Sequence, residues 1–236
     1  MALPQLNSSR FSLTIPSTGQ EVEYRPYLVK EEKILMMALE SQDQKQVLKA
    51  VSEIIEVCVF DEIDVSTLAM FDIEYLFLQM RAKSVGEIIE VDIKCEDKNC
   101  KGSIPCEIKV DDIKPPVMHH NNMIEITDQV KIEARFPNIV DLESIDEEKL
   151  ATIEGASEMF ARLITAIYDG DEMHLAKDTP HDELIYFLES LNSSQYAKLT
   201  EFLNDLPTMV HTQTITCSLC NKPREVELKG LASFFT

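Results

Sequence analysis

Residues 86–110, GEIIEVDIKCEDKNCKGSIPCEIKV, place two cysteines between two stretches in which apolar and polar residues alternate. Gly86–Lys94 and Ile104–Val110 have the two-residue period of β-strands, with one side of each strand apolar. Cys95 and Cys100 fall in the short connection between them. The sequence therefore predicts a β-hairpin that carries two thiols at its tip.

The C-terminal part of the chain repeats this arrangement. Val210–Thr216 and Arg224–Leu228 alternate in the strand manner, and a C-x-x-C pair lies between them. Two hairpin tips that face each other supply the four sulfur ligands that a tetrahedral zinc ion prefers. We therefore predict a zinc-ribbon-like site made by the two hairpins, with the ligands Cys95, Cys100, Cys217 and Cys220.

Other interpretations of these cysteines stay open at this point. Cys106 lies in the strand that follows the first cysteine pair and could replace Cys100 as a ligand if the turn is wide. Cys217 and Cys220 could form a redox pair, although a redox C-x-x-C usually opens a helix and here strands lie on both sides. The two pairs could also be unrelated surface thiols. His211 is six residues from Cys217 and is expected to be a surface side chain.

A zinc ion held by four thiolates has no open position for water or substrate, and this distinguishes a structural site from a catalytic one. The predicted site would join segments that are far apart, because 117 positions separate Cys100 from Cys217. Structural zinc contributes on the order of 10 kcal/mol to the folding of small peptides. One ion could therefore decide whether the C-terminal hairpin is docked on the middle of the chain.

The remaining pattern predicts an α+β protein, with helical segments on either side of a β-rich middle. We expect four parts: a hairpin and helices in 1–85, the β-rich middle with the first cysteine pair in 86–140, a second helical part in 141–208, and the C-terminal hairpin in 209–236, docked on the middle. Strands are expected at Phe11–Ile15, Glu21–Arg25, Met123–Thr127 and Val130–Phe136, and helices at Lys30–Ser41, Gln44–Phe60, Asp72–Lys83, Ala156–Tyr168, Pro180–Leu191 (capped by Thr179) and Ser194–Leu206.

Composition excludes several classes of partner. The chain has 42 Asp and Glu against 22 Lys and Arg, a formal net charge of −20, and a field of this sign repels nucleic acid and anionic lipid. No apolar run is long enough for a membrane span, and Met1–Arg10 does not have the pattern of a signal peptide. We therefore expect a protein of a reducing cytoplasm, where paired cysteines more often hold metal than form disulfides.

The best enzymatic alternative is a zinc-dependent nucleobase deaminase, a hydrolase. His181, Asp182 and Glu183 spell H-x-E, and Cys217 and Cys220 supply a later C-x-x-C. The match is incomplete, because the deaminase pattern has proline before the first cysteine and a helix after the second. With only six glycines, the chain also has no Gly-rich phosphate loop. We therefore predict no catalytic residues.

Several stretches of the chain are distinctive: RPYLVKEEKILMMALE at 25–40, YDGDE at 168–172, TCSLC at 216–220 and VELKGLASFF at 226–235. They resemble the baseplate hub and hub-assembly proteins of T-even-type contractile-tailed bacteriophages. The resemblance implies a viral protein that builds the central hub of the tail, either as a component or as an assembly factor. It also implies that the partners are other hub proteins, and that the location is the host cytoplasm during assembly or the finished tail baseplate.

Overall fold

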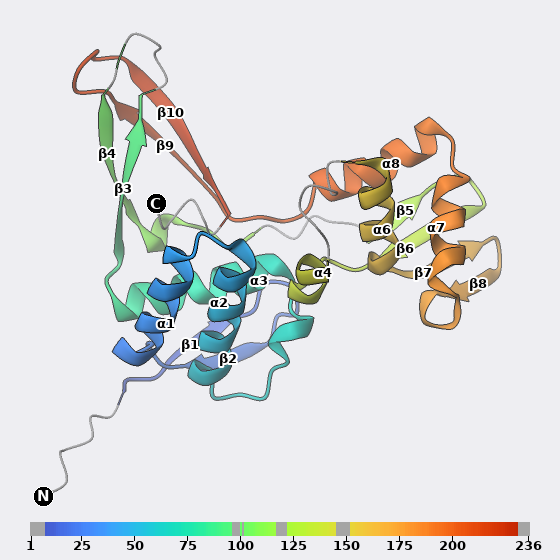
Figure 1. Ribbon diagram of the computed structural model, residues 1–236, viewed down its shortest axis with the longest axis horizontal. Coiled ribbons are helices and arrows are strands. Elements are labelled where there is room, and N and C mark those ends of the chain that lie inside the picture. The colour runs from blue at the N-terminus through green and yellow to red at the C-terminus, as the bar shows by residue number, and fades with distance from the viewer. Residues whose placement is uncertain (1–7, 96–99, 101, 117–121, 145–151, 231–236) are drawn as a thin grey trace, which may run out of the picture. The chain divides into compact units, whose positions relative to one another are not determined.

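The computed structural model describes residues 8–95, 100, 102–116, 122–144 and 152–230. The chain forms two compact units (Figure 1). Unit 1 combines Met1–Val117 with Thr208–Thr236, and unit 2 is Met118–Pro207. Unit 2 is therefore inserted in the sequence of unit 1, and the two cysteine pairs lie on either side of the insertion.

Unit 1 begins with a β-hairpin formed by β1 (Phe11–Thr14) and β2 (Glu21–Tyr24), which pair in antiparallel register. The chain after the second helix extends this hairpin, because the Phe60 amide donates to the Glu23 carbonyl at 2.9 Å. Apolar residues of β2, among them Val22 and Tyr24, are buried. The hairpin thus closes one side of the helical core.

Three helices form the centre of unit 1. In α2 the buried residues follow the three- and four-residue spacing that the sequence predicts. The helix α3 is buried on more than one face, since the consecutive residues Leu76, Phe77 and Leu78 are all buried. The helix α2 begins at an Asp43 cap, whose carboxylate accepts from the Lys45 amide at 2.9 Å. The helices are α1 (Val29–Glu40), α2 (Gln44–Cys58) and α3 (Met70–Ser84), with short 3-10 turns at Val65–Thr67 and Val110–Asp112.

A buried carboxylate joins the β1–β2 turn to α3. Asp72, in the first turn of α3, is 0% exposed and accepts a 2.9 Å bond from the Ser17 amide, together with a bond from the Ser17 hydroxyl. Burial raises the pKa of Asp72, and the two bonds from Ser17 oppose that rise. This contact fixes the position of the hairpin against the helices.

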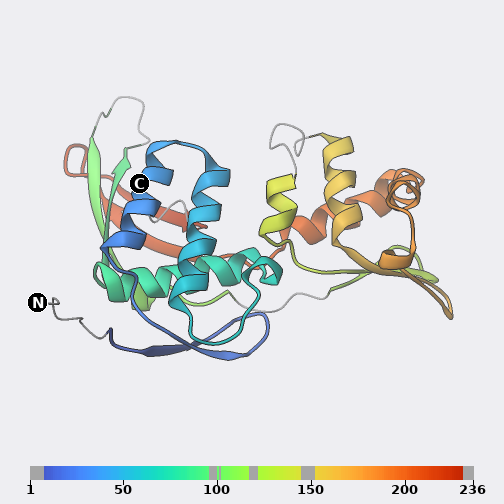
Figure 2. The ribbon, with the colours of Figure 1, turned by 60° about the horizontal axis from the view of Figure 1, so that its bottom comes forward.

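Two further hairpins complete unit 1. One is formed by β3 (Ile88–Lys94) and β4 (Ser103–Lys109), and the other by β9 (Val210–Thr216) and β10 (Pro223–Lys229). The strands β4 and β9 are in contact, and the two hairpins run alongside each other (Figures 1 and 2). The strands of the first hairpin alternate strictly between buried and exposed residues over most of their length.

Unit 2 is a four-stranded antiparallel sheet in the order β5-β6-β7-β8, packed against helices. Its core combines sheet residues such as Ile132 with helix residues such as Phe160 and Phe202. The strands are β5 (Met123–Glu125), β6 (Val130–Ala134), β7 (Ile164–Asp169) and β8 (Glu172–Leu175). The helices are α4 (Ile139–Ser144), α6 (Ile153–Leu163), α7 (His181–Glu189) and α8 (Ser193–Asn204), with a 3-10 turn at Ala176–Asp178.

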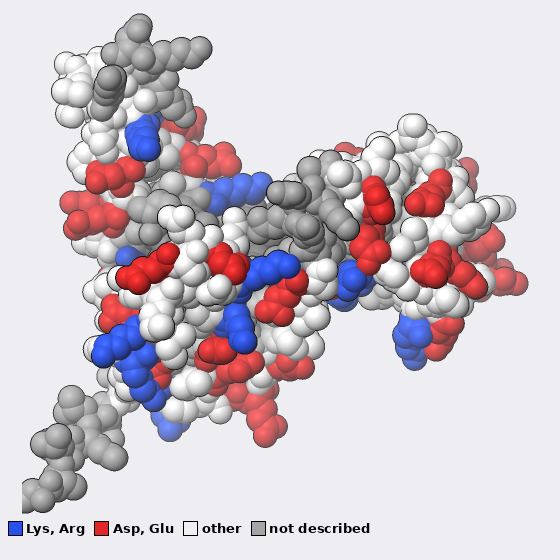
Figure 3. All heavy atoms as spheres, in the orientation of Figure 1, with Lys and Arg blue, Asp and Glu red and all other residues white. Residues whose placement is uncertain are grey.

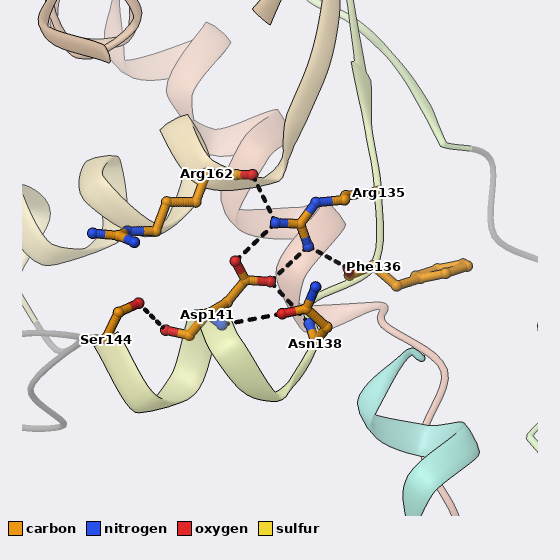
Figure 4. A network of polar contacts seen from close by, with 6 residues as sticks. All are labelled: Arg135, Phe136, Asn138, Asp141, Ser144 and Arg162. Atoms are coloured by element: carbon orange, nitrogen blue, oxygen red, sulfur yellow. Dashed lines mark hydrogen bonds and ion pairs between the residues drawn. The ribbon is translucent and has the colours of Figure 1, made fainter. Parts of the chain in front are cut away.

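An arginine and an aspartate join three elements of unit 2 (Figure 4). The Arg135 guanidinium, just after β6, donates to both carboxylate oxygens of Asp141 in α4, at 2.6 and 2.8 Å. It also donates to the Arg162 carbonyl near the end of α6 at 3.0 Å. The Asp141 carboxylate is buried and accepts a further bond from the Asn138 amide. Such bidentate geometry holds its partners in one orientation.

Two expectations about unit 2 were wrong. The helix expected at Ala156–Tyr168 ends at Leu163, and Ile164–Asp169 forms β7, since its β-branched residues pair with β6 on one edge and β8 on the other. Thr179 does not cap the next helix: its hydroxyl donates to the Leu175 carbonyl, and the cap position is Pro180. Strand pairing overrides the helical pattern in the first case, and in the second a local bond across the preceding 3-10 turn takes the Thr179 hydroxyl away from the cap.

The α+β class is confirmed, with mixed helices and small sheets and with the four cysteines gathered between two hairpins. The structure also has elements that the sequence pattern does not reveal, namely α4 and β8. No helix in the described part of the chain is long and apolar enough to cross a membrane.

Candidate metal centre

Four cysteines from the tips of the two long hairpins of unit 1 come together. Cys95 directly follows β3, and Cys100 precedes β4; Cys217 directly follows β9, and Cys220 precedes β10. All four Sγ atoms lie within 4.8 Å of one another. The structure thus gathers the four residues that the sequence singled out as ligands.

The spacing of the sulfurs suits a tetrahedral ion. The Sγ atoms of Cys95 and Cys220 are 3.8 Å apart, and those of Cys100 and Cys217 are 3.7 Å apart. Four Zn–S bonds of about 2.3 Å at tetrahedral angles separate their sulfurs by about 3.8 Å. The cysteines are free thiols, so the sulfurs are not held together by disulfides. The residues present therefore fit a four-coordinate ion of the zinc type.

Backbone hydrogen bonds shape each tip. The Cys95 amide donates to the Gly102 carbonyl at 2.8 Å, which closes the first turn. In the second turn the Cys217 amide donates to the Lys222 carbonyl, and the Asn221 amide donates back to the Cys217 carbonyl. Asn221 has a φ of 51°, in the left-handed region that asparagine tolerates better than most residues. These bonds direct both sulfurs of a tip toward the other hairpin.

Gly102 is placed against the sulfurs. A Cβ atom at this position would lie 3.1 Å from the Cys217 Sγ, 3.2 Å from the Leu219 Cδ1 and 3.4 Å from the Cys100 Sγ. Such distances are tighter than ordinary packing contacts, so a side chain here would push on the cluster. The absence of a side chain at Gly102 lets the first hairpin approach the second.

The electrostatics of the cluster favour the ionisation of one thiol and oppose the ionisation of further thiols. Amide N–H groups of Cys220 and Leu219 donate to the Cys217 sulfur and lower the pKa of this thiol to about 6. The Gly102 amide acts in the same direction on Cys100, but burial and the neighbouring thiols outweigh it and raise that pKa to about 11. A bound divalent cation would remove the repulsion between the four thiolates.

The two cysteines outside the cluster are buried in apolar surroundings. Cys106 lies in β4, is 2% exposed, and its thiol donates to the Gln213 amide oxygen at 3.5 Å. It does not join the four clustered sulfurs, and Cys100 does. Cys58 is fully buried on α2, and burial raises its pKa to about 11. Burial of this kind is usual for structural cysteines.

His181, the histidine of the H-x-E pattern, has a different partner. Its Nε2 atom lies 3.1 Å from each carboxylate oxygen of Glu158, so the ring joins the start of α7 to α6. Burial acts against the charged form of Glu158, but the contacts with His181 and Arg162 lower its pKa overall. Among the residues that the structure describes, the group able to hold a metal contains cysteines alone.

Two cavities lie elsewhere in unit 1. One of 540 Å³ lies beside β1 and α3, and no histidine, cysteine or carboxylate is among the residues that line it. The other, of 360 Å³, is lined by six residues: Ile88, Glu107, Lys109, Asp112, His211 and Gln213. His211, expected from the sequence to be a surface side chain, lines this cavity. The sequence pattern does not reveal the cavity, because its lining comes from strands that are distant in the chain, such as β4 and β9, which are in contact.

Comparison with known proteins agrees with the resemblance noted in the sequence. The model of the T4 bacteriophage base plate protein family matches residues 8–236. The chain belongs to this family. Membership indicates a structural role in the baseplate of a T4-type phage tail, assembled with other baseplate proteins. No curated protein and no solved structure matched the chain.

Proposed function

We propose that this baseplate protein is a non-enzymatic component or assembly factor of the hub, and that its cysteine cluster holds one structural zinc ion. The observation that carries the metal proposal is the spacing of the four sulfurs, all within 4.8 Å, with cross-hairpin distances of 3.8 and 3.7 Å. The observation that carries the role is the family match over residues 8–236.

The donor set argues for zinc over the other common divalent ions. Thiolates are soft ligands that suit zinc, whereas magnesium and calcium take oxygen ligands. Four sulfurs complete the tetrahedral sphere, which leaves no site for a substrate or an activated water. The ion would therefore hold the structure together, and the deaminase alternative gains no support from a cluster without histidine.

The position of the ion explains what it would stabilise. Cys217 is 0% exposed, but Cys95, Cys100 and Cys220 are only half-buried, so few apolar contacts protect the tips. Thin β-structures of this kind have little core and commonly need a metal or another cross-link. A zinc ion at the tips would bind the C-terminal hairpin to the hairpin before the insertion, and so join the two sequence segments of unit 1.

Charge indicates the kind of surface that a partner presents. Unit 2 contains 19 acidic and 6 basic residues, a net charge of −13, whereas unit 1 carries the remaining −7. Acidic side chains outnumber basic ones on the visible face (Figure 3). We expect the hub proteins that contact unit 2 to offer basic or neutral surfaces, since like charges across an interface oppose binding.

The metal proposal is tested by native mass spectrometry of the full chain, with and without a chelator, on the wild type and on Cys95→Ser and Cys217→Ser. We expect one zinc per wild-type chain and none in either variant. Cys106→Ala is the matched control, because it removes a buried thiol of the same hairpin that lies outside the cluster, and it should keep the ion. Zinc retained by Cys95→Ser, or no zinc in the wild type, would overturn the proposal.

The role in the hub is tested by disrupting the gene in the phage and examining the baseplates. Failure to form a central hub, rescued by the wild-type gene, is the expected result. Protein found in finished wild-type baseplates would identify a component, and protein needed for assembly but absent from them would identify an assembly factor. Normal hubs without the protein would contradict both.

A further inference from the structure

Two pairs of the clustered thiols face each other across the hairpins: the Sγ atoms of Cys95 and Cys220 are 3.8 Å apart, and those of Cys100 and Cys217 are 3.7 Å apart. All four sulfurs lie within 4.8 Å of one another. A disulfide requires about 2.05 Å between sulfurs, a further approach of somewhat under 2 Å. Side-chain rotation can supply a movement of this size.

We propose that the cluster is an oxidative modification site, at which a peroxide converts the four thiols into two disulfides, Cys95–Cys220 and Cys100–Cys217. Both bonds would cross between the hairpins, so the connection that the metal makes would become covalent when the ion leaves. The inference uses the same residues as the proposed zinc site but rests on the sulfur geometry alone.

The chemistry balances with hydrogen peroxide as the oxidant. A cysteine thiolate attacks one peroxide oxygen, the O–O bond breaks, and a sulfenic acid and one water form after proton uptake. The facing thiolate then attacks the sulfenic sulfur and displaces hydroxide, which leaves as a second water. Each disulfide takes two electrons from the sulfurs and consumes one peroxide, so two peroxides convert the cluster and release any bound ion.

Folding decides which sulfurs pair. In an unfolded chain, closing a short loop costs less entropy than closing a long one, so the neighbours in each tip would pair first. The cross-hairpin pairs are 125 and 117 positions apart and would be the least favoured. In the folded chain the hairpins have already brought these distant residues together. Cross-hairpin disulfides are therefore a signature of the folded cluster.

The setting of a tail baseplate gives such a modification a use. Phage particles leave a reducing cytoplasm for surroundings in which disulfides persist. A metal held by thiolates can be lost there to oxidation or to competing ligands. Two cross-hairpin disulfides would keep the tips joined after that loss.

The test treats the purified full-length protein with a small excess of hydrogen peroxide, blocks the remaining thiols at acid pH, digests with pepsin and maps disulfides by mass spectrometry. We expect peptides that link Cys95 to Cys220 and Cys100 to Cys217. Cys58 and Cys106 should still be reduced. Disulfides within each tip, or between two chains, would overturn the inference.

Two double variants sharpen the comparison. Cys95→Ser with Cys220→Ser leaves the facing pair Cys100 and Cys217, whereas Cys95→Ser with Cys217→Ser leaves Cys100 and Cys220. The first should form its disulfide several-fold faster, and equal rates would contradict the pairing. Zinc content measured before oxidation separates the two proposals. If the protein contains no zinc but forms cross-hairpin disulfides, only the zinc proposal is rejected. If it contains zinc but its disulfides form within each tip, only the disulfide proposal is rejected.

Discussion

The Sγ atoms of Cys100 and Cys217 lie 3.7 Å apart, although 117 positions separate the two residues in the chain. Between them lies all of unit 2, which folds around its own core. The contact therefore connects two segments of unit 1 that no local interaction would bring together. The stability of this connection, and that of each unit, can be examined by single substitutions.

Gly102→Ala should weaken metal binding. The added methyl group would lie 3.1 Å from the Cys217 Sγ and 3.2 Å from the Leu219 Cδ1, so the Cys217 sulfur must move by a few tenths of an ångström. Overpacking of this kind costs about 1–3 kcal/mol, which corresponds to roughly 5- to 150-fold in affinity. Competition with a coloured chelator measures the change.

Ser103→Ala is the matched control for Gly102→Ala. Ser103 is the next residue, begins β4 and is exposed, and its hydroxyl makes only a long 3.3 Å bond to Asp92. Its removal should leave metal affinity unchanged within twofold. Equal affinities for both variants would mean that the close approach at Gly102 does not matter for the site.

Asp141→Ala should destabilise unit 2 strongly. The substitution leaves the Arg135 guanidinium without its bidentate partner and removes the acceptor of the Asn138 amide. Asp141 is buried, but the Arg135 side chain is 37% exposed and can be solvated when its partner is removed. Loss of hydrogen bonds to a charged group then costs about 1.5–3 kcal/mol. Urea unfolding of the full chain, monitored through a signal that reports on unit 2, measures the change in the free energy of unfolding.

Glu125→Ala is the comparison for Asp141→Ala. Glu125 pairs with Lys131 at 2.7 Å in the same unit, but both side chains are exposed. Exposed pairs contribute at most about 1 kcal/mol. A loss for Asp141→Ala no larger than for Glu125→Ala would show that the network in Figure 4 is not a major source of stability.

Asp72→Asn should change how the stability of unit 1 depends on pH. Burial raises the pKa of Asp72 in the folded protein above its usual value of 3.8. Below pH 3.8 the carboxyl is protonated in both the folded and the unfolded protein. As the pH rises from 3.8 through the folded pKa, the unfolded state loses its proton first, so the free energy of unfolding falls. Asparagine stays neutral and can still accept from the Ser17 amide and donate to its hydroxyl.

The stability of Asp72→Asn relative to the wild type should therefore increase as the pH rises from below 3.8 to neutral. Thermal unfolding at a series of pH values measures this difference. Asp72→Ala provides the contrast, because it leaves the Ser17 amide without its partner and should be less stable than Asp72→Asn at every pH. If the difference in stability between Asp72→Asn and the wild type did not change with pH, burial would not disfavour the charged carboxylate.

Local patterns in the sequence determined most of the elements. The helix around Leu48 and the hairpins that carry the cysteine pairs follow from periodicity, because their buried and exposed residues recur at regular spacing. The helix around Leu76 was also expected, but it is buried on more than one face. The four cysteines could be selected because the turns between alternating strands hold them. The family resemblance could be recognised from short stretches, and the match over residues 8–236 confirms it.

Tertiary structure decided the rest. Ile164–Asp169 has a spacing that also suits a helix, and only pairing with β6 and β8 makes it a strand. Sequence spacing left Cys100 and Cys106 as alternatives; the contact of β4 with β9 buries Cys106 against Gln213, and the turn brings Cys100 to the other three sulfurs. A site made from residues more than a hundred positions apart depends on how the hairpins pack, and no local pattern encodes that distance.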